Sequence, residues 1–316
     1  MDLPRLENIN INGKRVLVRG DLDTDRFELT DYRLKSMVPT LDYLKEHGAN
    51  IILMGHRGRP EGKVDEKLSL KPFGKVFEKW RVEILENLRF DPREEENDES
   101  FARELAAKGD VYVNEAFSTS HREHTSFVGV PKFLPHAAGL HFTKEVENLS
   151  RVLENPKKPV VAIISGVKQD KLTYIDGVKK FADKILIGGR LPEYIHDASP
   201  LRKDEKLVVG SLIVDKEDIS MSTVEKFEAE IAKAGTVVVS GPVGKFEDAG
   251  HQQGTKRVFE AVVNSSAFKV AGGGETQEAL AMLGLEEHID WISVGGGAML
   301  QFLASGTLPG IQALVN

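Results

Sequence analysis

Short runs of β-branched and other apolar residues alternate along the chain with longer stretches in which apolar residues recur at helical spacing. Such runs, without internal alternation, are typical of strands buried on both faces, as in a parallel sheet. We expect strands at 15–19, 50–54, 82–85 and 110–113 in the first half, and at 159–164, 184–188, 207–210, 236–240, 268–271 and 291–294 in the second. The pattern predicts an α/β fold built from two Rossmann-like, doubly wound parallel sheets.

The stretches between these strands predict amphipathic helices. We expect them at 35–47, 71–80, 98–108, 143–154, 172–181, 222–234, 254–264, 276–284 and 297–305. The helix at 143–154 ends at Asn155-Pro156, and Pro159 precedes the next strand, which marks a domain boundary. Since 316 residues exceed one ordinary core, we expect two domains, 1–153 and 154–316, joined by this hinge helix. The last residues are expected to pack back on the first domain.

In the first half, charged and polar side chains follow the ends of the strands. They are Asp21 and Asp23 in RGDLDTD, His56 and Arg59 in GHRGRPEG, Arg89 in ENLRF, and His121, Arg122 and His124 in STSHREHTS. The carboxyl ends of parallel strands meet at one edge of a sheet, where α/β proteins bind ligands. Arginine suits carboxylates and phosphates, and histidine donates a hydrogen bond without a fixed charge. The first half therefore predicts a pocket for a small anion.

In the second half, glycine-rich loops follow the strands. They are SGVK (165–168), GGR (188–190), SGPVG (240–244), AGGGET (271–276) and VGGGAM (294–299). Glycines before a helix let backbone N–H groups approach a phosphate at the positive end of the helix dipole. Lys168 and Lys171 follow the first strand of this half, where an ammonium could stabilise a phosphoryl group during transfer.

Each motif also has a purely structural interpretation. A single glycine triplet is as consistent with a tight turn as with a phosphate site, and the basic loops and lysines could be solvated. His121 and His124 could ligate a metal, but no carboxylate with supporting spacing accompanies them. The acidic run REEEND (93–98) is typical of a solvated loop and helix start. No Walker-type P-loop occurs, and no G-x-G-x-x-G follows the first strand.

Composition narrows the class of protein. The net charge of −7 argues against a general nucleic-acid binder, so an anion site must be local. The absence of cysteine excludes a disulfide, a thiolate nucleophile and a Cys-ligated metal. The start lacks the features of a signal peptide, and no apolar run approaches the length of a membrane span. We expect a cytoplasmic enzyme, with no membrane partner.

Ten blocks of sequence resemble the phosphoglycerate kinase family, in the same order from end to end. They are RVLVRGDLDTD, NIILMGHRGRPEG, LSLKP, ILENLRF, DVYVNEAFSTSHREHTSFVG, SGVKQDK, SGPVGKFED, GTKRVFEAV, GGGET and ISVGGGAMLQFLASGTLPGI. The resemblance implies a glycolytic, hinge-bending, monomeric kinase that transfers a phosphoryl group reversibly between 1,3-bisphosphoglycerate and ADP, with Mg²⁺, giving 3-phosphoglycerate and ATP. The first domain would hold phosphoglycerate and the second the nucleotide.

The resemblance also implies roles for individual residues. The acid substrate would be held by Asp21, Asp23, Arg33, His56, Arg59, Arg122 and Lys158, with Arg33 and Lys171 acting on the transferring group. The nucleotide would be held by Lys168, Lys171, Gly189, Ser240, Gly241, Glu247, Gly272, Gly273, Gly274, Glu275 and Thr276, and Glu275 would also hold the metal.

Several of these positions depart from the family pattern. Asp23 and Ser240 replace asparagines, Glu275 replaces an aspartate, Lys158 replaces an arginine, and the loop 168–171 is one residue shorter. Asp23 adds a negative charge beside an anionic ligand, which weakens binding unless the carboxylate is protonated or turned away. The departures leave a second hypothesis open, a homologue that binds phosphoglycerate or nucleotide without turnover. A third is a kinase for another small carboxylate.

The chain is also shorter than the family pattern. Sequence is missing between residues 80 and 82 and again after 188–190, where the family builds part of its adenine pocket. LPEYIHDASP stands there instead, with Tyr194 available to stack on a base. The sequence therefore predicts a compact member of the family with a trimmed base pocket.

Overall fold

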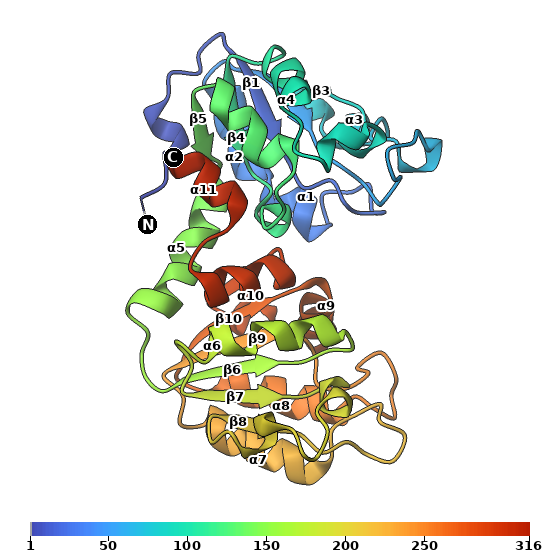
Figure 1. Ribbon diagram of the computed structural model, residues 1–316, viewed down its shortest axis with the longest axis vertical. Coiled ribbons are helices and arrows are strands. Elements are labelled where there is room, and N and C mark those ends of the chain that lie inside the picture. The colour runs from blue at the N-terminus through green and yellow to red at the C-terminus, as the bar shows by residue number, and fades with distance from the viewer. Residues whose placement is uncertain (1) are drawn as a thin grey trace. The chain divides into compact units, whose positions relative to one another are not determined.

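The computed structural model describes residues 2–316, which form two compact units. One unit comprises residues 2–147 and 307–316, and the other residues 148–306. Each unit contains one parallel sheet with helices around it (Figure 1). The prediction of two doubly wound, parallel-sheet α/β domains is confirmed. Helix α5 (Leu140–Glu154) begins in the first unit and ends in the second.

The first unit has a five-stranded sheet in the order β3-β2-β1-β4-β5. The strands are β1 (Arg15–Arg19), β2 (Asn50–Met54), β3 (Glu83–Ile84), β4 (Val111–Asn114) and β5 (His136–Ala138). In the register of the sheet, Arg19 lies beside Met54 of β2 and Asn114 of β4. The three central strands therefore end level with one another, and the segments that follow them emerge at one edge.

The helices of the first unit are α1 (Tyr32–Ser36), α2 (Val38–Glu46), α3 (Phe73–Val76), α4 (Glu99–Ala106) and α11 (Pro309–Val315). Short 3-10 helices are η1 (Leu6–Asn8), η2 (Glu66–Leu68), η3 (Glu78–Trp80), η4 (Leu88–Phe90), η5 (Pro92–Glu94), η6 (Phe117–Thr119) and η8 (Val130–Phe133), and η7 (Thr125–Gly129) is a π-helical turn. The single helix expected at 35–47 is two helices. Asp31 caps the first through Arg33 N and Leu34 N, and Pro39, which has no N–H to donate, lies in the first turn of the second.

The second unit has a six-stranded sheet in the order β11-β10-β9-β6-β7-β8. The strands are β6 (Val160–Ile164), β7 (Lys184–Ile187), β8 (Leu207–Val209), β9 (Thr236–Ser240), β10 (Phe268–Gly272) and β11 (Trp291–Ser293). Ile164 pairs with Ile187 and Ser240, and Gly272 pairs with Ser293. The glycine-rich loops after β6, β7, β9, β10 and β11 therefore emerge at one edge of this sheet.

Helices cover both faces of the second sheet (Figure 1). They are α6 (Ile175–Val178), α7 (Met221–Ile231), α8 (Gln253–Asn264), α9 (Gly274–Leu283) and α10 (Gly296–Ser305), with 3-10 helices η9 (Gln169–Tyr174), η10 (Leu191–Tyr194), η11 (Pro200–Lys203) and η12 (Glu286–His288). Helices α7, α8 and α9 share one apolar core with β6 and β9. Helices α6 and α10 pack closely, because a Cβ at Gly177 would lie 2.4 Å from that of Ala304.

Within residues 2–316, the structure has no single helix that is both long and apolar enough to cross a membrane. Only α10 and α11 taken together meet that test of length and composition.

Candidate active site

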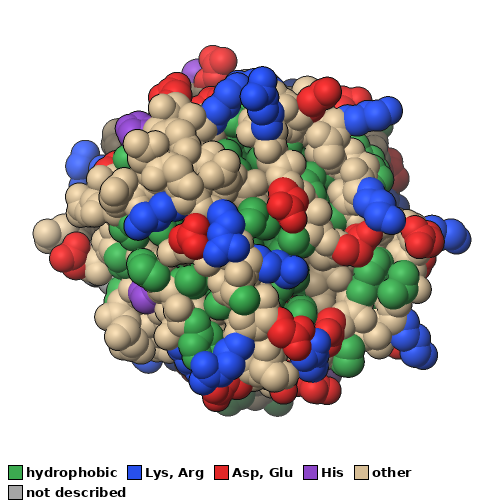
Figure 2. Space-filling view, turned by 90° about the horizontal axis from the view of Figure 1, so that it is seen from above, with side chains coloured by type: hydrophobic (Ala, Val, Ile, Leu, Met, Phe, Trp, Pro, Cys, Tyr) green, Lys and Arg blue, Asp and Glu red, His purple; other side chains and the backbone are tan. Residues whose placement is uncertain are grey.

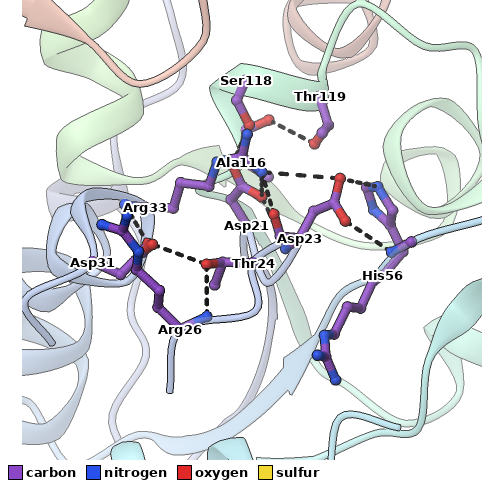
Figure 3. A network of polar contacts seen from close by, with 12 residues as sticks. Asp21, Asp23, Thr24, Arg26, Asp31, Arg33, His56, Ala116, Ser118 and Thr119 are labelled. Carbon is purple, nitrogen blue, oxygen red and sulfur yellow. Dashed lines mark hydrogen bonds and ion pairs between the residues drawn. The ribbon is translucent and has the colours of Figure 1, made fainter. Parts of the chain in front are cut away.

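The loop after β1 brings a buried carboxylate to the edge of the first sheet (Figure 3). Asp21 is 2% exposed and accepts hydrogen bonds from Ser118 Oγ and from Asp23 N, the latter at 3.3 Å. Arg33 Nη1 lies 3.7 Å from Asp21 Oδ1 and donates to the backbone oxygen of Asp23. The charge of Asp21 raises the pKa of Arg33, so the guanidinium is held firmly in its charged form. The structure thus brings Asp21, Asp23 and Arg33 together.

His56 follows β2 and is 1% exposed. Its Nδ1 lies 2.7 Å from Arg19 Nη2. Because arginine can only donate, Nδ1 must accept, and the neutral ring then carries its proton on Nε2. Burial, followed by the charge of Arg19, lowers the pKa of His56 well below its ordinary value. His56 is therefore a neutral Nε2–H donor.

A chain of buried hydrogen bonds fixes Arg19 in turn. Arg19 Nε donates to Ser126 Oγ at 2.9 Å, and Ser126 donates from Oγ and N to the two carboxylate oxygens of Glu94, at 2.6 and 3.0 Å. Arg19, Ser126 and Glu94 are all fully buried. Burial raises the pKa of Glu94, and the charge of Arg19 opposes that shift. The expectation that 93–98 is a solvated acidic run is wrong for Glu94, which anchors the histidine of the site.

The basic cluster, which we define as His56, Arg89, His121, Arg122 and His124, contains buried nitrogens that lack a hydrogen-bond partner. Within residues 2–316 these are His56 Nε2, Arg89 Nε and Nη2, His121 Nδ1, Arg122 Nε and His124 Nδ1. Buried polar atoms are nearly always paired. Several unpaired nitrogens of arginine and histidine side chains in one cluster therefore indicate a site for an anion. Arg59, in contrast, is exposed.

Arg89 holds the loop after β2 in place. Its Nη1 donates to Gly58 O at 2.7 Å, and its Nε lies 3.0 Å from Glu95 Oε1. Burial lowers the pKa of Arg89, and the neighbouring Arg122 lowers it further. The sequence places Arg89 after a strand, but without the fold it gives no sign that the side chain is 2% exposed and points into the cluster.

The cluster makes stability depend on pH. Burial, reinforced by Arg89 and Arg122, lowers the pKa of His124 to about 3. Below pH 6.5, His124 binds a proton in the unfolded chain but stays neutral in the folded chain. The free energy of unfolding therefore falls as pH drops from 7 to 5. Allowing for solvent screening, we expect a loss of about 1 kcal/mol from this group. Urea unfolding at pH 7 and 5 measures it.

The variant His124→Gln should show a smaller loss between pH 7 and 5 than the parent chain. His288→Gln is the matched control, because His288 is exposed and lies in the other unit. An unchanged pH difference in His124→Gln would contradict the burial argument.

In the second unit, Lys171 lies against the ends of β6 and β9. Its Nζ donates to Ser165 O at 2.5 Å and to Ser240 O at 3.2 Å. Burial lowers the pKa of Lys171, and the charge of Glu275 opposes that shift. Ser240 Oγ is buried without a partner in the described chain, on the same residue whose backbone oxygen accepts from the ammonium.

Glycines around this lysine leave room that a side chain would fill. Gly241 has φ +108°, and a Cβ there would lie 2.1 Å from Ser165 O. A Cβ at Gly166 would lie 3.1 Å from Lys171 Nζ and 3.9 Å from Glu275 Oε2. The ammonium and the carboxylate therefore both border the space above Gly166.

The loop after β10 lies beside the same space. Thr276 Oγ1 accepts from Gly241 N and donates to Gly272 O, both at 2.9 Å, which ties this loop to the one after β9. Gly273, at φ +105°, precedes Gly274, the first residue of α9. The N-terminus of α9 therefore opens onto this edge with glycine backbone, as a phosphate site requires.

A cavity of about 240 Å³ continues from these loops. It is lined by Gly166, Val167, Gly189, Arg190, Glu217, Pro242, Gly244, Lys245, Phe246, Glu247 and Glu275. The predicted residues Gly189, Glu247 and Glu275 thus share one cavity. Tyr194 Oη donates to Val167 O at 3.3 Å, while Lys168 is exposed.

Glu275 is the described carboxylate best placed to hold a magnesium ion in the second unit. Magnesium is usually bound through one or two protein carboxylates, with phosphates and waters completing the shell. Within residues 2–316 no group of three or more His, Asp or Glu side chains could hold a metal. A single carboxylate beside the space above Gly166 fits an ion that arrives with a phosphate. In the first unit, His121 and His124 belong to no such group of three side chains among the described residues.

Lys158 is not brought together with the other predicted residues of its unit. It precedes β6, and its Nζ bonds to Phe181 O at 3.0 Å and pairs with Asp183 at 3.1 Å. Those partners lie just before β7, at the amino edge of the sheet, opposite Lys171 and the glycine loops. The lysine ties two strand starts together, and its place in the substrate site stays a prediction.

Comparison with known proteins agrees with the sequence blocks. The phosphoglycerate kinase family model matches residues 6–83, 75–217 and 213–306. The phosphoglycerate kinase of Moorella thermoacetica is 34% identical over 387 residues, covering 98% of each chain, and that of Solibacter usitatus is 35% identical over 384 residues, again covering 98% of each. Both alignments are longer than this chain of 316 residues, so these relatives contain segments that it lacks.

Solved structures give the same result. The phosphoglycerate kinase of Coxiella burnetii is 28% identical with a TM-score of 0.85, covering 99% of each chain. That of Pyrococcus horikoshii is 28% identical with a TM-score of 0.83, covering 99% of this chain and 98% of its own. With relatives above 30% identity over nearly its whole length, this chain belongs to the phosphoglycerate kinase family.

Proposed function

We propose that this chain transfers a phosphoryl group reversibly between 1,3-bisphosphoglycerate and ADP, giving 3-phosphoglycerate and ATP. The observation that carries the proposal is the position of Lys171, whose ammonium lies among the glycine loops beside Glu275. In the direction of ATP use, a carboxylate oxygen of 3-phosphoglycerate attacks the γ-phosphorus. A new O–P bond forms, the bond from that phosphorus to the bridging oxygen breaks, and ADP leaves without any proton transfer.

The first unit would bind the acid substrate. His56 Nε2–H and the unpaired nitrogens of Arg89 and Arg122 supply donors for a phosphate. Arg33, held by Asp21, would contact the carboxylate that receives the phosphoryl group, and the exposed Arg59 would close over the ligand. Lys158 stays a predicted contact of the acid substrate.

The second unit would bind the nucleotide. The N-terminus of α9 and the glycines at 272–274 offer backbone N–H groups to the phosphates. Lys171 would stabilise the charge that spreads over the equatorial oxygens during transfer. The cavity lined by Gly189 and Glu247 would take the nucleoside, with Lys168 nearby at the surface.

Members of this family use ADP and ATP and usually Mg²⁺, and we propose that Glu275 holds the ion here. When bound, the ion would supply positive charge that offsets the negative charge of the phosphates. Glu275 is the second residue of α9, so its carboxylate is carried on a rigid helix rather than on the loop. Lys171 and Glu275 offset each other's charge when no ligand is bound.

The proposed partners are small molecules, and the proposed setting is the cytoplasm, with the chain acting as a monomer. On the face drawn in Figure 2, basic and acidic side chains are interspersed. This face shows no continuous basic patch of the kind that binds nucleic acid. This supports the local anion sites rather than a general polyanion surface.

A coupled assay with 3-phosphoglycerate, ATP and Mg²⁺ tests the proposal. We expect turnover in the range of ordinary kinases, about 1–100 s⁻¹. The alternative, a homologue that binds without turnover, would show calorimetric binding of either ligand and no turnover above that of a Lys171→Ala control. Turnover with another small acid but not with 3-phosphoglycerate would indicate a different carboxylate substrate.

A further inference from the structure

The first unit carries a carboxylate inside its own cationic pocket. Asp23 Oδ1 accepts a hydrogen bond from Gly58 N at 2.8 Å. Its Oδ2 lies 3.8 Å from His56 Nε2 and 3.9 Å from Arg33 Nη1. Figure 3 shows the carboxylate of Asp23 beside the ring of His56. The side chain is 36% exposed, and it faces the cationic groups rather than pointing away from them. Burial lowers the pKa of Arg19 and of Arg89, and the negative charge of Asp23 is among the charges that oppose these shifts.

The donors that Asp23 faces are those an incoming anion needs. Gly58 N is already used by Asp23. His56 Nε2–H points toward Asp23 from a distance too long for a hydrogen bond and has no other partner within residues 2–316. Arg33 Nη1 is shared between Asp21 and Asp23. An anion that enters must therefore lie beside a like charge, which costs affinity.

A ligand hydroxyl reverses part of this cost. Within residues 2–316, Oδ2 of Asp23 accepts no hydrogen bond, and the side chain is partly exposed, so Oδ2 can accept one from a hydroxyl next to the ligand's acid group. A phosphorylated acid without that hydroxyl is repelled by the carboxylate of Asp23 and forms no hydrogen bond with it. Discrimination of this kind arises when a site can form a hydrogen bond with the substrate hydroxyl that it cannot form with the analogue.

We infer that Asp23 is a specificity-determining residue, an internal anion that favours phosphorylated hydroxy acids over phosphorylated acids that lack the hydroxyl. The inference rests on the proposed function, because it concerns the acid-binding half of the same reaction. The replacement of the family's asparagine by Asp23 would then change which acids bind.

Calorimetric titration of the full chain with two ligands tests the inference. One is 3-phosphoglycerate, and the other is 3-phosphopropionate, by which we mean the phosphate ester of 3-hydroxypropionate, which lacks only the 2-hydroxyl. For Asp23→Asn, whose amide oxygen can still accept from Gly58 N, we expect 3-phosphopropionate to bind about tenfold more tightly. The affinity for 3-phosphoglycerate should change less, so the ratio between the two ligands falls. Asp23→Ser, which also removes the charge, should shift the ratio the same way. The matched control is Asp25→Asn, whose carboxylate is 90% exposed and pairs with Arg57.

The outcomes separate the two claims. If the parent chain binds 3-phosphoglycerate and both variants leave the ratio unchanged or bind 3-phosphopropionate more weakly, the inference is overturned while the proposed function stands. If no acid binds to the parent chain or to the variants, the proposed function fails and the inference fails with it.

Discussion

Replacing Lys171 by alanine is expected to reduce kcat by about a thousandfold in both directions of the reaction, with little change in nucleotide affinity. The ammonium is fixed by Ser165 O and Ser240 O, so it meets the transferring group without reorganisation. Loss of one such preorganised donor costs about 10²–10³ in kcat. The coupled assay gives kcat, and calorimetry with ATP in the absence of acid gives the nucleotide affinity.

Two further variants make the Lys171 result interpretable. Lys171→Met keeps most of the side-chain volume beside Gly166 and Gly241, so a loss shared with Lys171→Ala is due to the charge rather than to collapse of the loops. Lys226→Ala removes an exposed ammonium from α7 and should leave kcat unchanged. Equal kcat for the parent chain and Lys171→Met would remove this lysine from the mechanism.

Most strands of both sheets could be predicted because they are apolar runs. The runs are clearest in β1, β2, β4, β6 and β9, which are buried over nearly their whole length. Strand β5 could not be predicted, because His136–Ala138 is short, contains no β-branched residue and is recognised only by pairing with β4. Helix α11 begins at Pro309-Gly310 and is seven residues long, so its periodicity is too brief to detect. Its apolar residues Ile311 and Leu314 are buried by the rest of the unit.

The candidate site was predictable wherever a residue directly follows a strand. Asp21, His56 and the loops of the second unit emerge at the expected edges because the register aligns the strand ends. Sequence order does not reveal pairing across the fold. Glu94 belongs to an acidic run whose neighbours are solvated, and only the packing of η7 shows that its carboxylate holds Ser126. Lys158 precedes its strand, and the same rule of strand ends places it at the opposite edge.

Arg19 is the clearest case of a residue whose role depends on that hidden pairing. It ends a strand of apolar residues, is fully buried, and links Ser126 to His56 while stacking over Phe127 at 4.3 Å. Arg19→Met should lower the free energy of unfolding by about 3–5 kcal/mol, because Glu94 is left buried without its counter-charge. Urea unfolding of the variant measures this loss.

Adding Glu94→Gln to Arg19→Met distinguishes support of the fold from support of the site. The double variant no longer buries an uncompensated charge, and an amide oxygen can still accept from Ser126, so we expect it to recover a large part of the lost stability. It should not recover affinity for 3-phosphoglycerate, which we expect to stay about tenfold weaker, because His56 Nδ1 has lost its donor and the ring no longer holds its proton on Nε2 alone. Nitrogen chemical shifts of His56 report that change of tautomer directly. Full recovery of both stability and affinity would mean that Arg19 serves the fold only, and that the proton on His56 is fixed by other means.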